Sequence, residues 1–405
     1  MTAMPMWVKT PIAAGLFALL ALSLRPQELQ HFVGVMNVEV PVRVFDGGRF
    51  VDDLTLADFE ITENGTPQMP VGLYLIKKTG IRKEEAGGAA LPPRPAAPMR
   101  RTIILEFELM DPLPKVDEAM DYFCDEVLQP EDSLIVITPR TTYRFKPEAL
   151  AKIPRPEIAR QLKGKLRSDV LAGAAEFKRI QSNILDVSRM PVDPDLKMQL
   201  FQEYLRLLRD RIGVPVAAIQ QLAKTLKTIE GQKFVFLFYE KEVAYVPNMG
   251  NFGDESLPNE EMFLSDAAQA DTTRLPSASP RAIEQAFADA AITAHFIYLT
   301  QPGTNAGALG MEYMAPLEGG ALEKRDMSAS IFGALQDVAR ATGGITESSG
   351  NAAAAFRTAV AASENYYLLY YVPANYKADG TFREIKVAVK GKSYRVTHRA
   401  GYFAN

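Results

Sequence analysis

The chain has 405 residues, with 45 basic and 49 acidic side chains, one cysteine and three histidines. At roughly 150 residues per domain, this length predicts two or three domains. The near balance of charge excludes a strongly basic nucleic-acid binder. The single cysteine, Cys124, excludes an intrachain disulfide framework and any zinc or iron–sulfur site that needs several cysteines.

The first 23 residues have the pattern of an export signal. Lys9 precedes an apolar run over residues 12–22, which is shorter than the ~20 residues that span a bilayer. Ala21 and Ser23 supply small residues at a cleavage site. We expect residues 1–23 to be a signal peptide and the protein to be exported, to the periplasm or out of the cell. An uncleaved signal anchor is the alternative, and no other segment predicts a membrane span.

Alternating apolar residues predict β-strands near both ends of the chain. In residues 33–78, alternate valines begin at Val38, and Asn64-Gly65 is a strong hairpin signal. In residues 363–405, an aromatic run over 366–372 precedes a second alternating stretch. Because isolated hairpins are only marginally stable, we expect these two segments to pack together as one antiparallel β-sandwich, with the intervening region inserted between them.

Residues 100–362 predict a separate α/β domain, which follows a Gly- and Pro-rich linker over residues 79–99. Within the domain, continuous apolar runs typical of strands buried on both faces alternate with helical patterns. These runs cover residues 102–107, 133–138, 233–239 and 294–299. Residues 146–230 contain no strand pattern, and we expect them to form a largely helical insertion.

Several short motifs, in this order and spacing, resemble the von Willebrand factor A-related proteins of the acidobacterial type. The motifs are the stretch from Leu54 to Gln68, Ala339-Arg-Ala-Thr-Gly-Gly344, Tyr366-Tyr-Leu-Leu-Tyr-Tyr-Val-Pro373, Gly380-Thr-Phe-Arg-Glu-Ile-Lys-Val387 and Arg399-Ala-Gly-Tyr-Phe403. The resemblance covers nearly the whole chain after the signal segment. It implies an α/β fold, a Rossmann-like doubly wound parallel sheet flanked by helices. Such domains usually bind proteins rather than catalyse reactions.

In this family a metal-ion-dependent adhesion site holds a divalent cation at the carboxyl ends of the strands, through Asp-x-Ser-x-Ser and a later aspartate. Here the resemblance places Glu106, Glu108 and Met110 at the first motif and Tyr239-Glu240 at the later position. A methionine thioether is a poor ligand for a hard cation, and each extra methylene displaces a carboxylate beyond the tolerance of a coordination shell. We therefore expect a degenerate site without a metal. A relaxed Ca²⁺ or Mg²⁺ site on Glu106, Glu108 and Glu240 is the alternative.

These observations predict an exported, non-catalytic protein that recognises a partner protein or a surface. Ligands of open α/β sheets bind at the carboxyl edge, so we expect contacts from the loops 106–114, 239–265 and 300–325. The candidate contact residues are Glu106, Glu108, Met110, Asp111, Tyr239 and Glu240. One alternative is a cation-dependent adhesion module that uses the three glutamates. Another is an exported hydrolase with an unrecognised site, which the lack of His-Glu-x-x-His, Gly-x-Ser-x-Gly and Walker motifs opposes.

Other conspicuous residues have a simpler structural explanation. His295 lies within an apolar strand pattern and Cys124 on the apolar face of a predicted helix, so both are expected to pack in the core. The tyrosine-rich run over residues 366–371 favours core and cross-strand packing, with a partner-binding edge as the alternative.

Overall fold

The computed structural model describes residues 37–86, 100–109, 112–212, 216–240, 243–247, 280–299, 322–326, 328–391 and 393–405. All of them belong to the second of two units into which the chain divides, Asn37–Asn405. The expected signal peptide, residues 87–99 of the linker, Met110, Asp111 and most of the loops 239–265 and 300–325 lie outside the described residues. No helix in the described ranges is long and apolar enough to cross a membrane.

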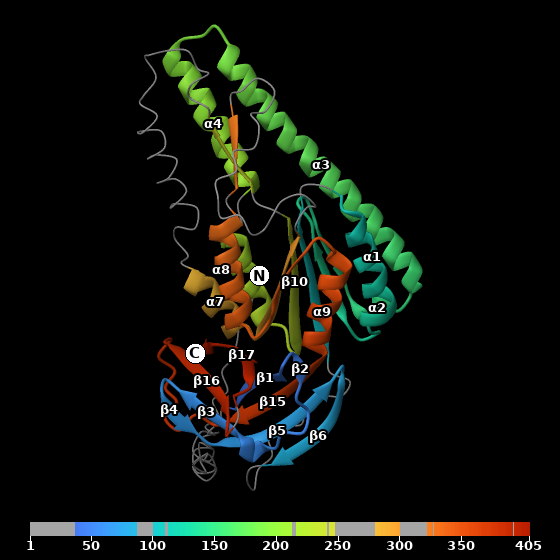
Figure 1. Ribbon diagram of the computed structural model, residues 1–405, viewed down its shortest axis with the longest axis vertical. Helices are drawn as coiled ribbons and strands as arrows, with labels where there is room; N and C mark the ends of the chain where they lie inside the picture. The colour runs from blue at the N-terminus through green and yellow to red at the C-terminus, as the bar shows by residue number, and fades with distance from the viewer. Residues whose placement is uncertain are drawn as a thin grey trace, which may run out of the picture. The chain divides into compact units, whose positions relative to one another are not determined.

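The described chain is a mixed α/β protein with antiparallel sheets and one mixed sheet, which confirms the fold class at this level (Figure 1). The helical elements are η1 (Leu56–Asp58), α1 (Pro114–Tyr122), η2 (Phe123–Val127), α2 (Pro147–Leu150), α3 (Arg155–Arg189), α4 (Pro194–Ile212), α5 (Val216–Lys227), α7 (Pro280–Asp289), α8 (Ser328–Ala341) and α9 (Ala352–Glu364). The segment expected to form a helical insertion contains α2 to α5, of which α3 alone has 35 residues.

The two ends of the chain meet in two antiparallel sheets. The inner sheet has the order β17 (Arg395–His398), β1 (Val38–Asp46), β15 (Asn365–Tyr371), β5 (Pro70–Lys77) and β6 (Gly80–Ala86), with β2 (Arg49–Phe50) beside β1. The outer sheet has the order β18 (Gly401–Phe403), β16 (Phe382–Val389), β3 (Phe59–Glu63) and β4 (Thr66–Gln68). Figure 1 shows β1 and β15 side by side, and their register pairs Val38 with Tyr371.

Strand β15, the aromatic run, lies inside the inner sheet between β1 and β5 and is buried on both faces. Tyr367 packs against Phe59 of the outer sheet, with ring centroids 5.3 Å apart. On the opposite face Tyr370 packs edge-on against Tyr74, at 5.7 Å between centroids. The expected core role of this run is therefore confirmed, and the partner-binding edge is ruled out by the position of the strand.

Strand β6 corrects the expected linker boundary. Residues 80–86, assigned from sequence to the flexible linker, pair with β5 in antiparallel register. The Gly and charge content of this stretch conceals the strand, because an edge strand can carry polar side chains on both faces. One of these side chains, Glu85, accepts the backbone N–H of Leu56 at 2.6 Å and is paired with Lys83 at 2.8 Å.

The mixed sheet, called here the central sheet, has the order β14 (Thr346–Ser349), β12 (Ile292–Leu299), β10 (Gln232–Glu240), β7 (Arg101–Glu108), β8 (Ser133–Ile137) and β9 (Thr142–Phe145). The four strands predicted from apolar runs pair in parallel. Strand β9 pairs antiparallel with β8, so the sheet is not purely parallel as expected. With only four residues, two of them exposed, β9 lacks the apolar run that marks its neighbours. A separate pair consists of β11 (Val243–Pro247) and β13 (Leu322–Asp326).

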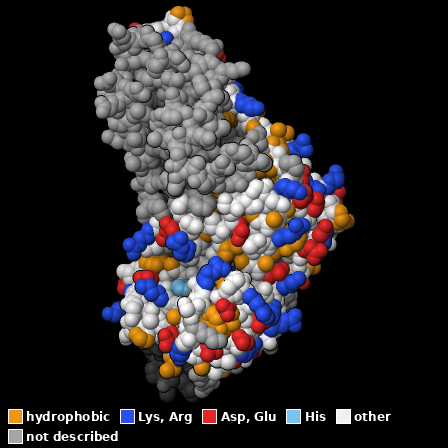
Figure 2. Space-filling view, viewed as in Figure 1, with side chains coloured by type: hydrophobic (Ala, Val, Ile, Leu, Met, Phe, Trp, Pro, Cys, Tyr) orange, Lys and Arg blue, Asp and Glu red, His pale blue; other side chains and the backbone are white. Residues whose placement is uncertain are grey.

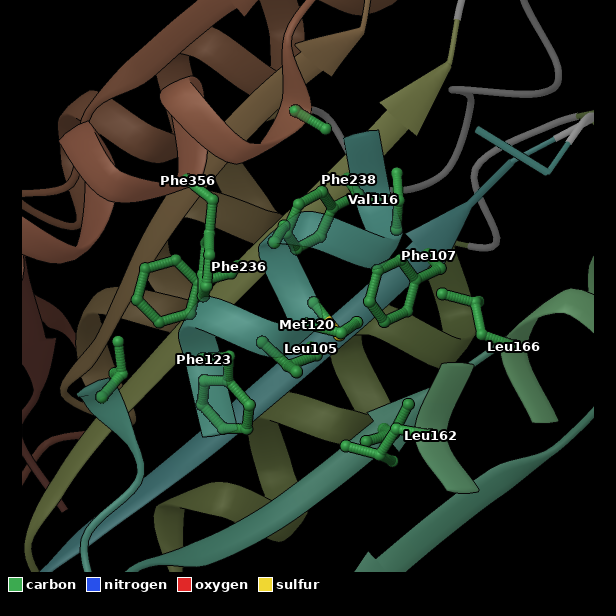
Figure 3. Close-up of a cluster of buried hydrophobic side chains, with 14 of the residues drawn as sticks. Leu105, Phe107, Val116, Met120, Phe123, Leu162, Leu166, Phe236, Phe238 and Phe356 are labelled. Atoms are coloured by element: carbon green, nitrogen blue, oxygen red, sulfur yellow. The ribbon is translucent and has the colours of Figure 1, made fainter. Parts of the chain in front are cut away.

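A large apolar cluster fills the space between one face of the central sheet and helices α1, α3 and α9. Figure 3 shows Phe107 and Phe238 from neighbouring strands pointing into it, and their rings stack at 4.8 Å between centroids. Phe356 of α9 packs edge-on against Phe236 at 5.1 Å. Cys124 is fully buried in this cluster, and burial raises the pKa of its thiol to about 12. Its expected packing role is thus confirmed.

The segment Thr342-Gly343-Gly344 lies between α8 and β14, and its backbone closely approaches the backbone of β12. A Cβ added to Gly344 would lie 1.8 Å from the carbonyl oxygen of Ala294, so no side chain fits there without displacing the start of β12. The Thr342 hydroxyl accepts the backbone N–H of Ala294 at 3.0 Å and donates to the carbonyl of Val338 at 2.9 Å. Glycine at position 344 is therefore required by packing.

We predict that Gly344→Ala lowers the free energy of unfolding by about 3 kcal/mol or more, because backbone cannot yield cheaply to the added methyl group. The matched control is Gly164→Ala within α3, where an added Cβ meets nothing within 4 Å. There alanine should stabilise by about 0.5–1 kcal/mol through helix propensity. Urea unfolding of both variants measures the two values, and equal effects would contradict the packing explanation.

Candidate functional site

The inner sheet contacts the amino edge of the central sheet, where its parallel strands begin. Gln232, the first residue of β10, donates its side-chain amide to Glu39 of β1 at 3.1 Å. Arg43 of β1 donates to the carbonyl of Gly343, just before β14, at 3.2 Å. Arg101, which opens β7, is held at the same edge by a buried ion pair with Asp132 at 2.6 Å. The inner and outer sheets together, called here the two-sheet module, thus make these contacts at the amino edge of the central sheet. The candidate site lies at the opposite, carboxyl edge.

The carboxyl edge has a switch point between β7 and β10. These two strands are neighbours, but the strand that follows β7 along the chain lies on one side and the strand that follows β10 lies on the other. Helices α1 and α7, which come after β7 and β10 along the chain, cover opposite faces of the sheet, and open α/β sheets bind ligands in the crevice at such a switch point. Glu106 and Glu108 lie at the end of β7, and Glu240 is the last residue of β10.

The structure brings two of the three candidate glutamates together. Ile103, Leu105 and Phe107 face the cluster beneath α1, α3 and α9, whereas Ile104 faces α5 and α7. Because side chains alternate along a strand, Glu106 and Glu108 share the face of Ile104. The same rule places Glu240 on the face of Phe236 and Phe238, which is the opposite one. Among the described residues, no group of three His, Cys, Asp or Glu side chains is placed to hold a metal ion.

Glu106 is buried, with 7% of its surface exposed. Burial raises the pKa of its carboxyl group to about 8, and the charge of Glu108 adds to the rise. Desolvation is the larger cause because no water shell stabilises the charged form. At neutral pH Glu106 is therefore largely protonated, which lessens its repulsion of Glu108.

The other described candidates, Tyr239 and Glu240, are buried and do not lie on the surface. Tyr239 is 4% exposed and packs against Phe296, at 6.2 Å between ring centroids, while Glu240 is also 4% exposed. Sequence alternation places such residues on a face but does not show which helices cover that face. The two candidates beyond β7, Met110 and Asp111, lie outside the described residues.

A pocket of about 170 Å³ lies at the carboxyl end of β7, between the start of α1 and the side of α3. Its lining residues are Leu109, Pro112, Leu113, Val116, Asp117, Leu166, Arg167 and Val170. The first three fall in the loop 106–114 that the sequence predicts as a contact. The other wall comes from α3, and the sequence offers no signal for it because the two segments are more than 50 positions apart.

A buried carboxylate fixes the α3 wall of this pocket. Asp169, next to the lining residue Val170, accepts the hydroxyl of Thr138 at 2.7 Å and that of Tyr143 at 2.9 Å. Thr138 follows β8, and Tyr143 lies in β9. The β8–β9 hairpin and α3 are thus joined through one carboxylate, and this bond network holds the pocket wall against the sheet.

Comparison of the chain with protein-family models, with curated proteins and with solved structures found no match. The family resemblance therefore remains an expectation from the sequence motifs. Function is inferred below from the geometry of the carboxyl edge.

We predict that Glu106→Gln changes how stability depends on pH. The folded pKa of about 8 lies above the ordinary value of 4.5, so the folded state retains a proton that the unfolded state has lost. The wild type should therefore lose stability as pH rises from about 4.5 to about 8, by several kcal/mol at most. The glutamine variant should lack this loss and be more stable than the wild type at pH 8.5.

Urea unfolding between pH 5 and pH 9 measures this difference. The matched control is Glu118→Gln, an exposed glutamate of α1 paired with Lys115, which should keep the wild-type slope. Parallel curves for wild type and Glu106→Gln would show that Glu106 titrates in the folded protein as it does in water.

Proposed function

We propose that the protein is an exported, non-catalytic von Willebrand A-like protein that binds a partner protein through the carboxyl edge of its central sheet. The observation that carries this proposal is the pocket between α1 and α3 at the end of β7. It lies at the edge opposite the docked two-sheet module, and one of its walls is the loop after β7, a strand that borders the switch point of the sheet.

The topology of the central sheet supports the family part of the proposal. Numbered along the chain, β7, β8, β9, β10, β12 and β14 stand in the order 3-2-1-4-5-6, with the third strand antiparallel at one edge. Doubly wound sheets have this same strand order, which is why it supports the proposal. Apolar clusters cover both faces, with α1, α3 and α9 on one and α5 and α7 on the other. Fold alone does not establish function, so the argument for partner binding must come from the pocket itself.

The size and chemistry of the pocket favour a protein side chain as its ligand. A volume of about 170 Å³ is below the ~300–1,000 Å³ of typical small-molecule sites. Six of the eight lining residues are apolar, and the other two are Asp117 and the exposed Arg167. An apolar anchor surrounded by polar contacts is the usual arrangement of a protein-binding hot spot.

The surface charge supports a protein partner. On the face shown in Figure 2, basic and acidic side chains are interspersed over the described part of the molecule. The formal net charge of the chain is −4, which does not favour nucleic acid. Interspersed charges of both signs match the polar rim of protein interfaces.

The positions of the described histidines and the cysteine support a non-catalytic role. Nδ1 of His295 accepts the backbone N–H of Ile345, and Nε2 of His398 accepts that of Val387. Burial lowers the pKa of both imidazoles, and Cys124 is enclosed in the core. None of these three residues lines the pocket.

We predict that Leu113→Asp weakens partner binding at least tenfold, about 1.4 kcal/mol, because it places a carboxylate in the apolar lining. Leu113 is the residue before the first turn of α1, where aspartate is a favourable cap, so the helix should be retained. The matched control is Lys146→Asp, the corresponding exposed position before α2, away from the pocket.

Binding can be measured by photo-crosslinking in the native cell envelope, with the crosslinking side chain at position 167 or at position 386. Arg167 borders the pocket, and Lys386 is an exposed residue of β16 in the outer sheet. We expect one specific product from position 167, lost with Leu113→Asp and kept with Lys146→Asp. Equal products from both positions, or none from position 167, would contradict the proposed surface.

A further inference from the structure

Leu171 is an exposed leucine of α3 beside the pocket at the carboxyl end of β7. Half of its surface, 50%, is exposed. It directly follows Val170 and lies four residues after Arg167, and both of these residues line the pocket. Helix α3 is continuous over these positions, and side chains four residues apart on a helix are neighbours. A single exposed leucine needs no explanation by itself, but this one lies next to an apolar pocket.

The pocket has the right size and lining for one leucine side chain. Its volume is about 170 Å³, and an apolar cavity of roughly 150 Å³ holds one benzene molecule. Leu113 and Val116 come from the side of α1, and Leu166 and Val170 come from α3. An apolar side chain that enters between these walls is removed from water, which is favourable in proportion to the area it buries.

Two side chains of opposite charge line the same pocket. Asp117 belongs to α1 and Arg167 to α3, which lie side by side in Figure 1. Within the part of the chain that the structure describes, neither side chain forms a hydrogen bond or an ion pair. Both charges are therefore available to a partner that presents the opposite charges, and such complementarity selects one partner over others.

These features supply both members of two complementary pairs on one surface. The exposed Leu171 matches the apolar pocket, and Asp117 matches Arg167. The interface of a two-fold dimer must be self-complementary, because each copy meets the same surface that it carries itself. An unrelated partner would need only one member of each pair on this surface, so the presence of both members favours a second copy of this chain.

We propose that the partner bound at this pocket is a second copy of the chain. Leu171 of each copy enters the pocket of the other, and Asp117 of each copy pairs with Arg167 of the other. The inference rests on the proposed function, because it names the partner of that same pocket. A two-fold contact of this kind closes with two copies and does not extend into a filament.

Sedimentation equilibrium of the purified chain tests the role of the leucine. We expect the wild type to form a dimer, and Leu171→Asp to raise the dissociation constant at least tenfold, because a carboxylate replaces the apolar side chain in the pocket. The matched control is Leu196→Asp, at a leucine of α4 that is 46% exposed and does not line the pocket. It should keep the wild-type constant. A wild type that sediments as a monomer at every concentration would overturn the proposal.

Charge reversal tests the two-fold pairing. Asp117→Arg and Arg167→Asp should each weaken self-association at least tenfold, because each homodimer then brings like charges together. An equimolar mixture of the two variants should form dimers again, since every pair in the mixed dimer joins an arginine to an aspartate. This recovery also shows that both variants fold. A mixture that stays monomeric, with circular dichroism spectra like that of the wild type, would overturn the proposal.

Photo-crosslinking from position 167 in the native cell envelope separates this inference from the proposed function. A product that contains two copies of the chain supports the inference. A product with a different protein overturns the inference and leaves the proposed function in place. The absence of any product from position 167 contradicts both.

Discussion

The pairing of β1 with β15 is the contact on which the rest of the structure depends. It joins Val38 to Tyr371 and Val42 to Tyr367 across nearly the whole described chain. Closing so long a loop costs conformational entropy that a single strand pair does not recover. The aromatic strand β15 supplies the compensation, because it buries side chains on both faces, against the outer sheet on one and the α/β domain on the other.

This pairing also decides which edge of the central sheet can bind a ligand. With the inner sheet docked on the starts of the parallel strands, through Gln232 and Gly343, the amino edge is committed to contacts within the chain. The pocket between α1 and α3 stands at the other end of the same strands. The contacts of the two-sheet module and the proposed partner-binding pocket thus lie at opposite ends of the central sheet. Substitutions in the pocket can therefore change partner binding without disturbing the docked module.

Buried polar groups mark both ends of the central sheet, with different consequences. At the amino edge Arg101 and Asp132 form a buried ion pair, whereas Nε and Nη2 of Arg43 have no acceptor among the described residues. At the carboxyl edge Glu106 is kept largely protonated by burial.

The amino-acid sequence by itself determined the strands and their burial. The alternate valines from Val38 have the two-residue period of a strand, whereas the apolar runs of the central sheet and the tyrosines of β15 indicate strands by their short length and their β-branched or aromatic content. Polar edge strands such as β6 and β9 were not predictable, since pairing rather than side-chain burial defines them. Only the tertiary structure decided that Glu106 and Glu240 face opposite sides and that α3 completes a pocket with the loop after β7. The physical reason is that a sequence period assigns a side chain to a face, whereas burial, pKa and cavities depend on what distant segments place against that face.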